Sequence, residues 1–188
     1  KQINNWHLPG RSGGNEILRK MNRKYTGEFY IDLIKKIRSA RPEIAIGTDI
    51  IVGFCGETEE QFENTVNLYK QCDFDIAYQA MYSERSGTAA AKVFKDDVPQ
   101  QEKKRRWQAI QDLMEETTYR KNQKFLNKIV SVLVDNCDDK GVCSGNSREM
   151  KLAQFFDGPD LVGQIVDVKI TNPETWILRG EHVNNNCV

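Results

Sequence analysis

One stretch in the first third of the chain combines residues that suit a ligand-binding turn. In residues 47–62 (GTDIIVGFCGETEEQF), a run of β-branched residues leads into two glycines and then into acids. The run is typical of a strand buried on both faces, Gly53 and Gly56 bracket a tight turn, and Thr58 can cap the helix that follows. In α/β folds, ligands bind at the carboxyl ends of parallel strands. We therefore expect residues 49–57 to face a site, the alternative being a βα turn without chemistry.

A second strand-end loop of similar composition follows in sequence. Residues 75–82 read as a strand, and the next six residues, SERSGT, are polar. A short strand at residues 3–8 also precedes a glycine-rich turn, and helices are predicted at 16–21, 27–40 and 59–72. This alternation suggests part of a parallel barrel. Because three strands cannot close a barrel, we expect the rest of the sheet upstream of Lys1.

The pattern changes in the last third of the chain. After Pro99, a helix is predicted at 100–124, with the basic run 103–106 near its start, where the helix dipole disfavours positive charge. Five short strands are then predicted at 129–134, 142–147, 152–156, 163–170 and 176–180. They describe a small antiparallel barrel of the OB-like size that often binds nucleic acid. The predicted domains are thus 1–124 and 125–183, followed by a disordered tail at 184–188.

Composition narrows the class of protein. Of 188 residues, 39% are hydrophobic and 29% charged, which is typical of a soluble globular chain, and no apolar run is long enough to cross a membrane. Net charge is zero, yet residues 1–41 carry ten basic and three acidic side chains, and residues 101–124 carry seven and four. These blocks could meet a polyanion, although for each block by itself a solvated helix face is the better explanation.

The five cysteines show no regular spacing. An odd count without a CxxC motif argues against a disulfide framework and suits scattered thiols in a reducing cytoplasm. Cys137 and Cys143 could share a metal, but no further ligand lies near them in sequence, so no metal site is expected.

Four motifs in one order give the chain a family resemblance. They are HLPxxSG at 7–13, MNRxYT at 21–26, TDIIVGFxGETEE at 48–60 and YSxRxGTxA at 82–90. At these spacings they resemble the radical S-adenosylmethionine (SAM) methylthiotransferases, most closely those acting on N6-isopentenyladenosine next to the anticodon of transfer RNA. The resemblance covers residues 3–183. Arg11 and Cys55 depart from it, since the family usually has Gln and Pro there.

This resemblance implies a fold and cofactors. The fold is α/β: the C-terminal part of a partial TIM-like (β/α) radical SAM barrel, followed by a TRAM domain, the small RNA-binding β-barrel of the family. The full-length enzymes use SAM and hold two 4Fe–4S clusters on cysteine motifs absent from these residues, and clusters need thiolates. We therefore expect a fragment that lacks redox chemistry by itself, whose partners are the missing N-terminal half and the anticodon stem-loop of tRNA.

The resemblance also implies roles for particular residues, none of them catalytic. Asp49 could accept hydrogen bonds from SAM, and Arg85 could pair with its carboxylate or with substrate phosphate, the alternative being an Asp–Arg salt bridge. The expected SAM-binding residues are Ser12, Gly13, Thr48, Asp49, Gly53, Glu57 and Arg85. The expected RNA-binding residues are Arg19, Arg23, Lys24, Arg148, Lys151, Lys169 and Arg179, with Phe155 or Trp176 stacking unless they are core.

Other functions stay open at this point. A related enzyme methylthiolates an aspartate of a ribosomal protein, but it usually has an acid where Arg85 stands. Another acts on threonylcarbamoyl-adenosine, and a non-catalytic RNA-binding module is the alternative from a different class. An open three-stranded sheet edge would also favour self-association.

Overall fold

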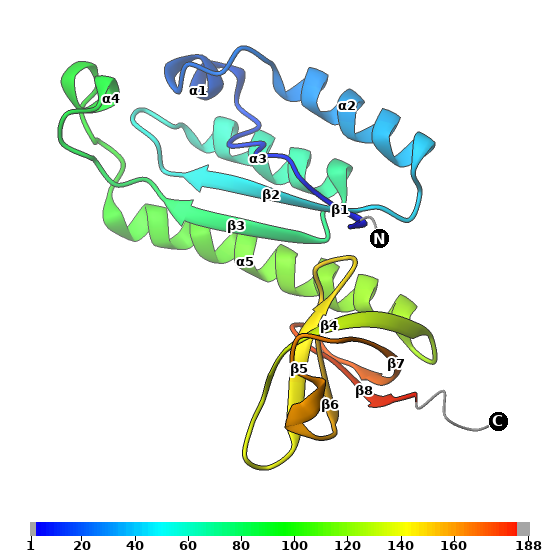
Figure 1. Cartoon of the computed structure of the whole chain (residues 1–188). Coiled ribbons are helices and arrows are strands. Elements are labelled where there is room, and N and C mark those ends of the chain that lie inside the picture. The colour runs from blue at the N-terminus through cyan, green and yellow to red at the C-terminus, as the bar shows by residue number, and fades with distance from the viewer. Residues whose placement is uncertain (1–2, 184–188) are drawn as a thin grey trace. The chain divides into compact units, whose positions relative to one another are not determined.

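The computed structural model describes residues 3–183, which form two compact units (Figure 1). One runs from Trp6 to Met114, and the other contains Glu115 onward together with the first few residues. The division falls inside a helix, earlier than the predicted boundary at residue 124. The last turn of that helix belongs with the second unit because the Asn122 amide donates to the Glu174 and Thr175 carbonyls.

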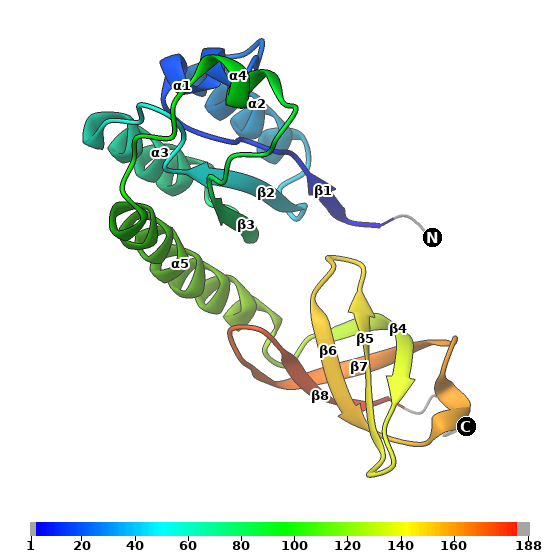
Figure 2. The same ribbon diagram turned by 90° about the vertical axis from the view of Figure 1, so that its left-hand side faces the viewer.

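The first unit is a three-stranded sheet with helices packed against it. Its strands are β1 (Asn5–His7), β2 (Ala45–Val52) and β3 (Ile76–Met81), in that spatial order, and β2 and β3 are parallel. Its helices are α1 (Asn15–Lys20), α2 (Gly27–Ala40), α3 (Glu59–Cys72), α4 (Ala89–Val93) and the first part of α5 (Gln100–Asn122). Figure 2 shows the same elements from the side.

The hydrophobic core lies between the sheet and α2 and α3. Ile46, Ile50 and Val52 on β2 pack with Ile34 of α2 and Phe62 of α3, and each is at most 1% exposed. The alternate β2 residues Asp49 and Ile51 are only half-buried. The prediction of a strand buried on both faces therefore holds for the first half of β2, where Ala45 and Gly47 are buried, and fails at Asp49 and Ile51.

Local signals define both long helices of this core. The Thr26 hydroxyl accepts from the Phe29 amide at the start of α2, and Thr58 forms a capping box with Gln61 at the start of α3. Both helices span the residues that the sequence predicts, because cap and apolar periodicity are encoded within each segment.

Helix α5 covers the outer edge of β3. The Trp107 indole donates to the Gln79 carbonyl at 3.1 Å, and the Ala77 amide donates to the Met114 sulfur at 3.4 Å. These side chains occupy backbone groups that a further strand would need. The edge of β3 is therefore covered at these two groups, and self-association through a sheet edge stays a prediction.

The second unit is a closed five-stranded barrel. Its strands are β4 (Ile129–Cys137), β5 (Val142–Ser147), β6 (Leu152–Phe156), β7 (Ile165–Pro173) and β8 (Leu178–His182), in the order β4-β5-β6-β8-β7. Single 3₁₀ turns, η1 (Gln123–Phe125) and η2 (Pro159–Leu161), precede β4 and β7. Val132, Val168, Ile170 and Leu178 fill the interior.

These two units confirm the predicted fold class, an α/β part followed by a small β-barrel. The barrel strands differ from the predicted ones mainly at their ends, since β4 continues to Cys137 and β8 begins at Leu178. The predicted tail at 184–188 lies outside the described residues. Among residues 3–183, no helix combines the length and apolar character needed to cross a membrane.

Candidate functional site

A cleft of about 320 Å³ opens at the carboxyl ends of the strands of the first unit. It is mixed in character, because guanidinium and hydroxyl groups stand beside aliphatic side chains. Its lining comes from the turn after β1, from β2 and β3, from the loop before α4 and from the start of α4: Arg11, Ile51, Ala80, Met81, Tyr82, Ser83, Arg85, Thr88 and Ala90. The sequence-based expectation of a ligand site at these strand ends thus coincides with a real concavity.

Asp49 contacts two side chains, those of His7 and Arg11, on the open face of the sheet. Its Oδ1 lies 3.1 Å from His7 Nε2, and its Oδ2 lies 3.3 Å from Arg11 Nη2. The expected alternative for Asp49, an Asp–Arg salt bridge, therefore exists, but Arg11 supplies it and Arg85 does not. Arg85 is exposed and lines the cleft.

Arg11 stands out in the sequence only as a departure from the family pattern. Its backbone has φ of +62°, and it joins the sheet through bonds of 2.8 Å from its amide to the Asp49 carbonyl and from the Ile51 amide to its own carbonyl. Its Nε is buried and without a protein partner. The positive charge and an unsatisfied donor make Arg11 a candidate anion contact that sequence reasoning missed.

Ser12, Gly13 and Thr48 shape the loop after β1 and do not line the cleft. Ser12 and Thr48 are at most 1% exposed. The Gly13 amide donates to the Thr65 hydroxyl at 2.9 Å, and a Cβ on Gly13 would lie 2.1 Å from the Asn64 carbonyl oxygen. These residues can affect a ligand only indirectly, through the loop conformation that they fix.

The turn at Gly53 is held in place by the buried carboxylate of Glu57. Glu57 Oε2 accepts from the Gly53 amide at 2.6 Å and from Arg106 Nη1 at 2.9 Å, and the Glu57 side chain is fully buried. Burial raises the pKa of Glu57 above its usual range, while the Gly53 amide and Arg106 oppose that rise. Glu57, one of the expected SAM-binding residues, thus holds the turn in place and does not line the cleft.

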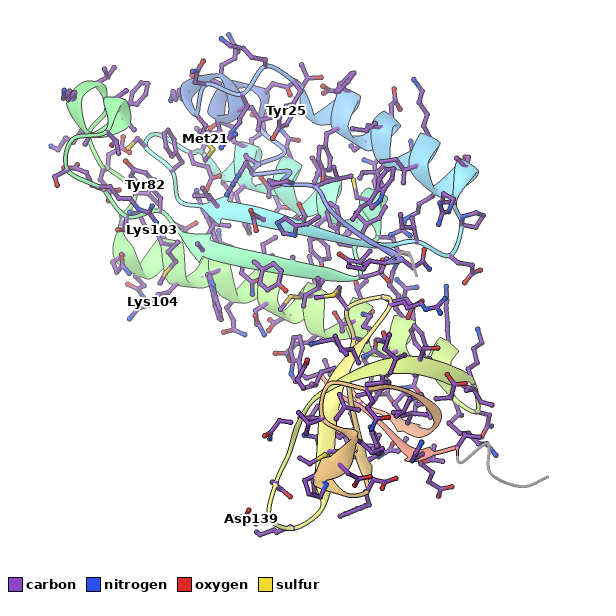
Figure 3. All side chains as sticks on the ribbon, viewed as in Figure 1. Met21, Tyr25, Tyr82, Lys103, Lys104 and Asp139 are labelled. Atoms are coloured by element: carbon purple, nitrogen blue, oxygen red, sulfur yellow. A yellow bond between two sulfur atoms is a disulfide. The ribbon has the colours of Figure 1, made fainter. Side chains whose placement is uncertain are left out.

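The basic run at the start of α5 completes this support. Lys103 Nζ lies 2.6 Å from Asp96 Oδ1 and donates to the Tyr82 carbonyl at 3.0 Å; Figure 3 labels both Lys103 and Tyr82. A Cβ on Gly53, whose φ is +69°, would lie 2.4 Å from Lys103 Cγ. Two of the four residues of the run are thus used internally, and the expectation that the run could meet a polyanion fails for Lys103 and Arg106, both nearly inaccessible.

The expected RNA-binding residues fall into different environments. Lys151 is only 9% exposed, and Arg179 is paired with Glu174 at 2.8 Å, so these two are not free cations on the barrel surface. Phe155 is core, whereas Trp176 is 46% exposed. The remaining candidates are exposed: Arg19, Arg23, Lys24, Arg148 and Lys169.

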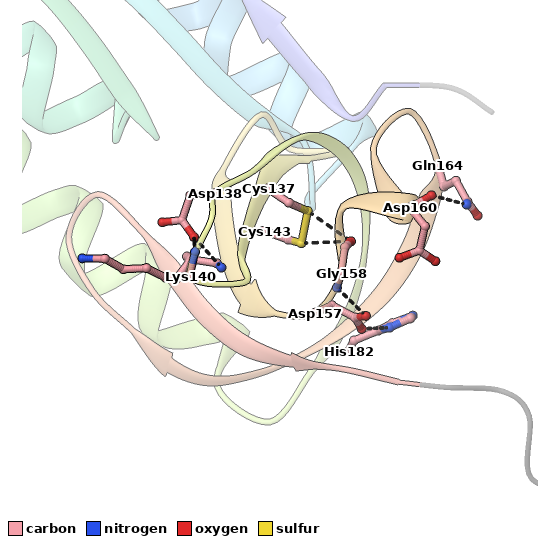
Figure 4. Close-up of a disulfide and its surroundings, with 10 residues drawn as sticks. Cys137, Asp138, Lys140, Cys143, Asp157, Gly158, Asp160, Gln164 and His182 are labelled. Atoms are coloured by element: carbon pink, nitrogen blue, oxygen red, sulfur yellow. Dashed lines mark hydrogen bonds and ion pairs between the residues drawn. A yellow bond between two sulfur atoms is a disulfide. The ribbon is translucent and has the colours of Figure 1, made fainter.

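The cysteines depart from the prediction of scattered thiols. Cys137 and Cys143 lie opposite each other on β4 and β5 and form a disulfide (Figure 4). Cys55 and Cys72 are buried free thiols, and burial raises the pKa of Cys72 to about 12. Within residues 3–183, no three His, Cys, Asp or Glu side chains come together in a way that could hold a metal ion.

Comparison with known proteins finds one matching family model and several similar synthases. Residues 3–69 match the family model of the Radical SAM superfamily. The chain is 46% identical over 180 residues to the tRNA-2-methylthio-N(6)-dimethylallyladenosine synthases of Geobacillus kaustophilus and Geobacillus thermodenitrificans, and 45% identical over 179 residues to that of Bacillus cereus strain B4264. These matches cover 94–95% of the chain.

The resemblance seen in the four motifs is thus borne out as a similarity: residues 3–69 match the Radical SAM superfamily, and nearly the whole chain is similar to synthases of this name. The chain spans 34–35% of the length of these curated relatives, about a third, and matches their C-terminal part.

Proposed function

We propose that the chain forms the C-terminal part of a tRNA methylthiotransferase that acts in the cytoplasm on N6-isopentenyladenosine next to the anticodon. The observation that carries this proposal is the match of nearly the whole chain to synthases of that name, running through both the α/β unit and the barrel. Arg85, where the ribosomal-protein enzymes usually have an acid, supports an RNA substrate.

The strand-end cleft fits a small zwitterion such as SAM. Arg11 and Arg85 offer guanidinium groups to a carboxylate, and Arg11 has a buried donor still unused. Ile51, Ala80 and Met81 offer apolar surface to the rest of the molecule. When bound, SAM would supply the methyl group and the radical chemistry of this family.

The residues of this chain position SAM rather than react with it. Asp49 fixes Arg11 from one side of the sheet, while Glu57 and Lys103 fix the Gly53 turn. Iron–sulfur clusters do not fit the described residues, since the thiols of Cys55 and Cys72 are buried and no ligand cluster exists among residues 3–183. The two clusters of the proposed enzyme would be held outside these residues.

The experiment that tests the RNA part is electrophoretic binding of the chain to an unmodified tRNA anticodon stem-loop across a salt series. We expect binding that weakens steeply with salt, because exposed Arg and Lys would displace counterions from phosphate. Replacing Arg148 and Lys169 with Ala should lower the salt slope by about 1 for each phosphate that the replaced side chain neutralises. A Lys36→Ala variant, exposed on α2, is the matched control and should keep the slope.

Three results would count against this proposal. Salt-insensitive retention would indicate non-ionic sticking, and absence of binding by a folded chain would favour the ribosomal-protein alternative. Binding without preference between the stem-loop and an unrelated hairpin would favour a general RNA-binding module.

A further inference from the structure

The barrel contains a chemical group that the proposed function does not use, the disulfide at one end of the β4–β5 hairpin. Cys137 is the last residue of β4, and Cys143 is the second residue of β5, directly opposite it in the strand register. The turn between them, residues 138–141, projects from the barrel at Asp139 (Figure 3). The pair thus joins two strand ends beside an exposed turn.

The two cysteine residues differ in exposure. Cys143 is fully buried in the barrel core, whereas Cys137 is partly exposed. Exchange with an external thiol requires in-line access to one sulfur and a route for the other to leave. Cys137 offers the first from solvent, and Cys143 would leave into the protein interior. The difference in exposure therefore favours attack at Cys137.

The residues around Cys137 and Cys143 can accommodate both the disulfide and the two reduced thiols. Cys137 Sγ and Cys143 Sγ lie 3.4 and 3.5 Å from the Gly158 carbonyl oxygen (Figure 4). Disulfide sulfurs have no hydrogen to donate, but after reduction either thiol could donate to this oxygen, which has two lone pairs. After reduction, the thiols would therefore already lie within hydrogen-bonding distance of the Gly158 carbonyl oxygen.

The accepting carbonyl is itself held by a polar chain. The Gly158 amide donates to Asp157 Oδ1 at 2.8 Å, and Asp157 Oδ2 lies 2.6 Å from His182 Nδ1 on β8. Because Asp157 and His182 keep this turn in place without the disulfide, reduction need not move it. Ladder pairing of β4 with β7 and of β5 with β6 is likewise independent of the two sulfurs.

We propose that Cys137 and Cys143 form a site of reversible thiol–disulfide exchange, with a dithiol as the reducing partner. A thiolate of the dithiol attacks Cys137 Sγ, the Cys137–Cys143 bond breaks, and Cys143 leaves as a thiolate that takes up a proton. The second thiol of the reagent then attacks the mixed disulfide and releases Cys137 as a thiol. Two electrons and two protons pass to the protein, and the dithiol becomes a disulfide.

This proposal fits a reducing cytoplasm, where the pair would be present mostly as thiols. It assigns the pair a modification chemistry separate from SAM or RNA, so its failure would leave the proposed function untouched. In the reduced chain we expect the barrel to stay folded and the turn at residues 138–141 to exchange its amide hydrogens faster.

The test is a dithiothreitol redox titration of the folded 188-residue chain, read by differential alkylation and peptide mass spectrometry. We expect a linked Cys137–Cys143 peptide in the oxidised sample, and joint alkylation of both cysteines after reduction in native buffer. The buried Cys55 and Cys72 serve as internal controls and should stay unalkylated, which shows that the chain has not unfolded.

Single variants test the direction of attack. In C143S the remaining Cys137 should react with a thiol reagent at least about tenfold faster than Cys143 does in C137S, as exposure controls thiol reactivity. Three results would overturn the proposal: no linked peptide under oxidising conditions, reduction only after denaturant is added, or equal labelling rates in the two variants.

Discussion

At the scale of single residues, the turn beside the candidate site is held by charged side chains that do not line the cleft. Glu57, Arg106 and Glu102 form a connected group under the Gly53 turn, in which Arg106 Nε lies 2.6 Å from Glu102 Oε1. Removing one member of a buried pair leaves the other charge without a partner, which costs far more than losing a surface pair. The strand-end turn should therefore respond more strongly to Arg106 than to any exposed arginine.

The first prediction compares two neighbouring arginines. Arg106→Leu should lower the free energy of unfolding of the α/β unit by about 3–5 kcal/mol, because Glu57 stays buried and unpaired. Arg105→Leu, half-exposed on the same helix, should cost about 1 kcal/mol or less. Urea unfolding followed by tryptophan fluorescence measures both, and equal losses would contradict the role given to Arg106.

The second prediction concerns acid stability. Hydrogen bonds from Arg105, and then from Arg106, lower the pKa of Glu102 to about 2. A carboxyl with a depressed folded pKa binds fewer protons than in the unfolded chain, so its stabilisation is complete above an unfolded pKa of about 4.3. This contribution is lost as the pH falls from there towards 2.

Glu102→Gln should therefore lower the urea midpoint at pH 7 but have little effect near pH 2. Midpoints measured between pH 2.5 and 7 give the comparison. A wild-type-minus-variant difference that stays constant across this range, or grows at low pH, would show that Glu102 is not held as the structure describes.

At the scale of elements, α5 covers the edge of the sheet in addition to connecting the α/β unit to the barrel in sequence. Trp107 and Met114 contact the β3 backbone, which accounts for their helical spacing. The apolar pattern alone predicts an amphipathic helix but does not show that the indole N–H serves a strand carbonyl.

The third prediction follows from this cover. Trp107→Phe keeps much of the apolar contact, removes the donor to Gln79, and should cost about 1 kcal/mol of unfolding free energy. Trp107→Ala should cost more and also uncover the strand edge, which favours self-association. Sedimentation velocity should then show concentration-dependent larger species for Trp107→Ala only, and a monomeric Trp107→Ala variant would contradict the role of the helix.

Helices were predicted correctly from sequence where the residues that define them lie close together in the chain. The caps at Thr26 and Thr58 and the periodicity behind them define α2 and α3 completely. Site residues were predicted less well because their partners are distant in sequence. Gly13 is bound by Thr65, and Glu57 by Arg106, and no spacing rule connects these pairs. The cysteine pair was missed because only the hairpin register brings Cys137 opposite Cys143.

At the scale of the whole molecule, the chain combines two units of different kinds. The α/β unit has one face packed against helices and a strand-end cleft lined by two arginines. The barrel is closed and self-contained, with its core and its cysteine pair complete within residues 123–182. The identity to the synthases runs through both units, so one proposed function has to account for both.

The measurement that tests the central claim most directly is a titration of the ¹⁵N-labelled chain with SAM, followed by amide chemical shifts. We expect shifts at Arg11, Ile51 and residues 82–88, with none in the barrel strands, and weaker binding for Arg85→Ala. S-adenosylhomocysteine, which keeps the carboxylate, should shift the same amides. No shifts at millimolar SAM, or shifts confined to the barrel, would contradict a SAM site at the strand ends.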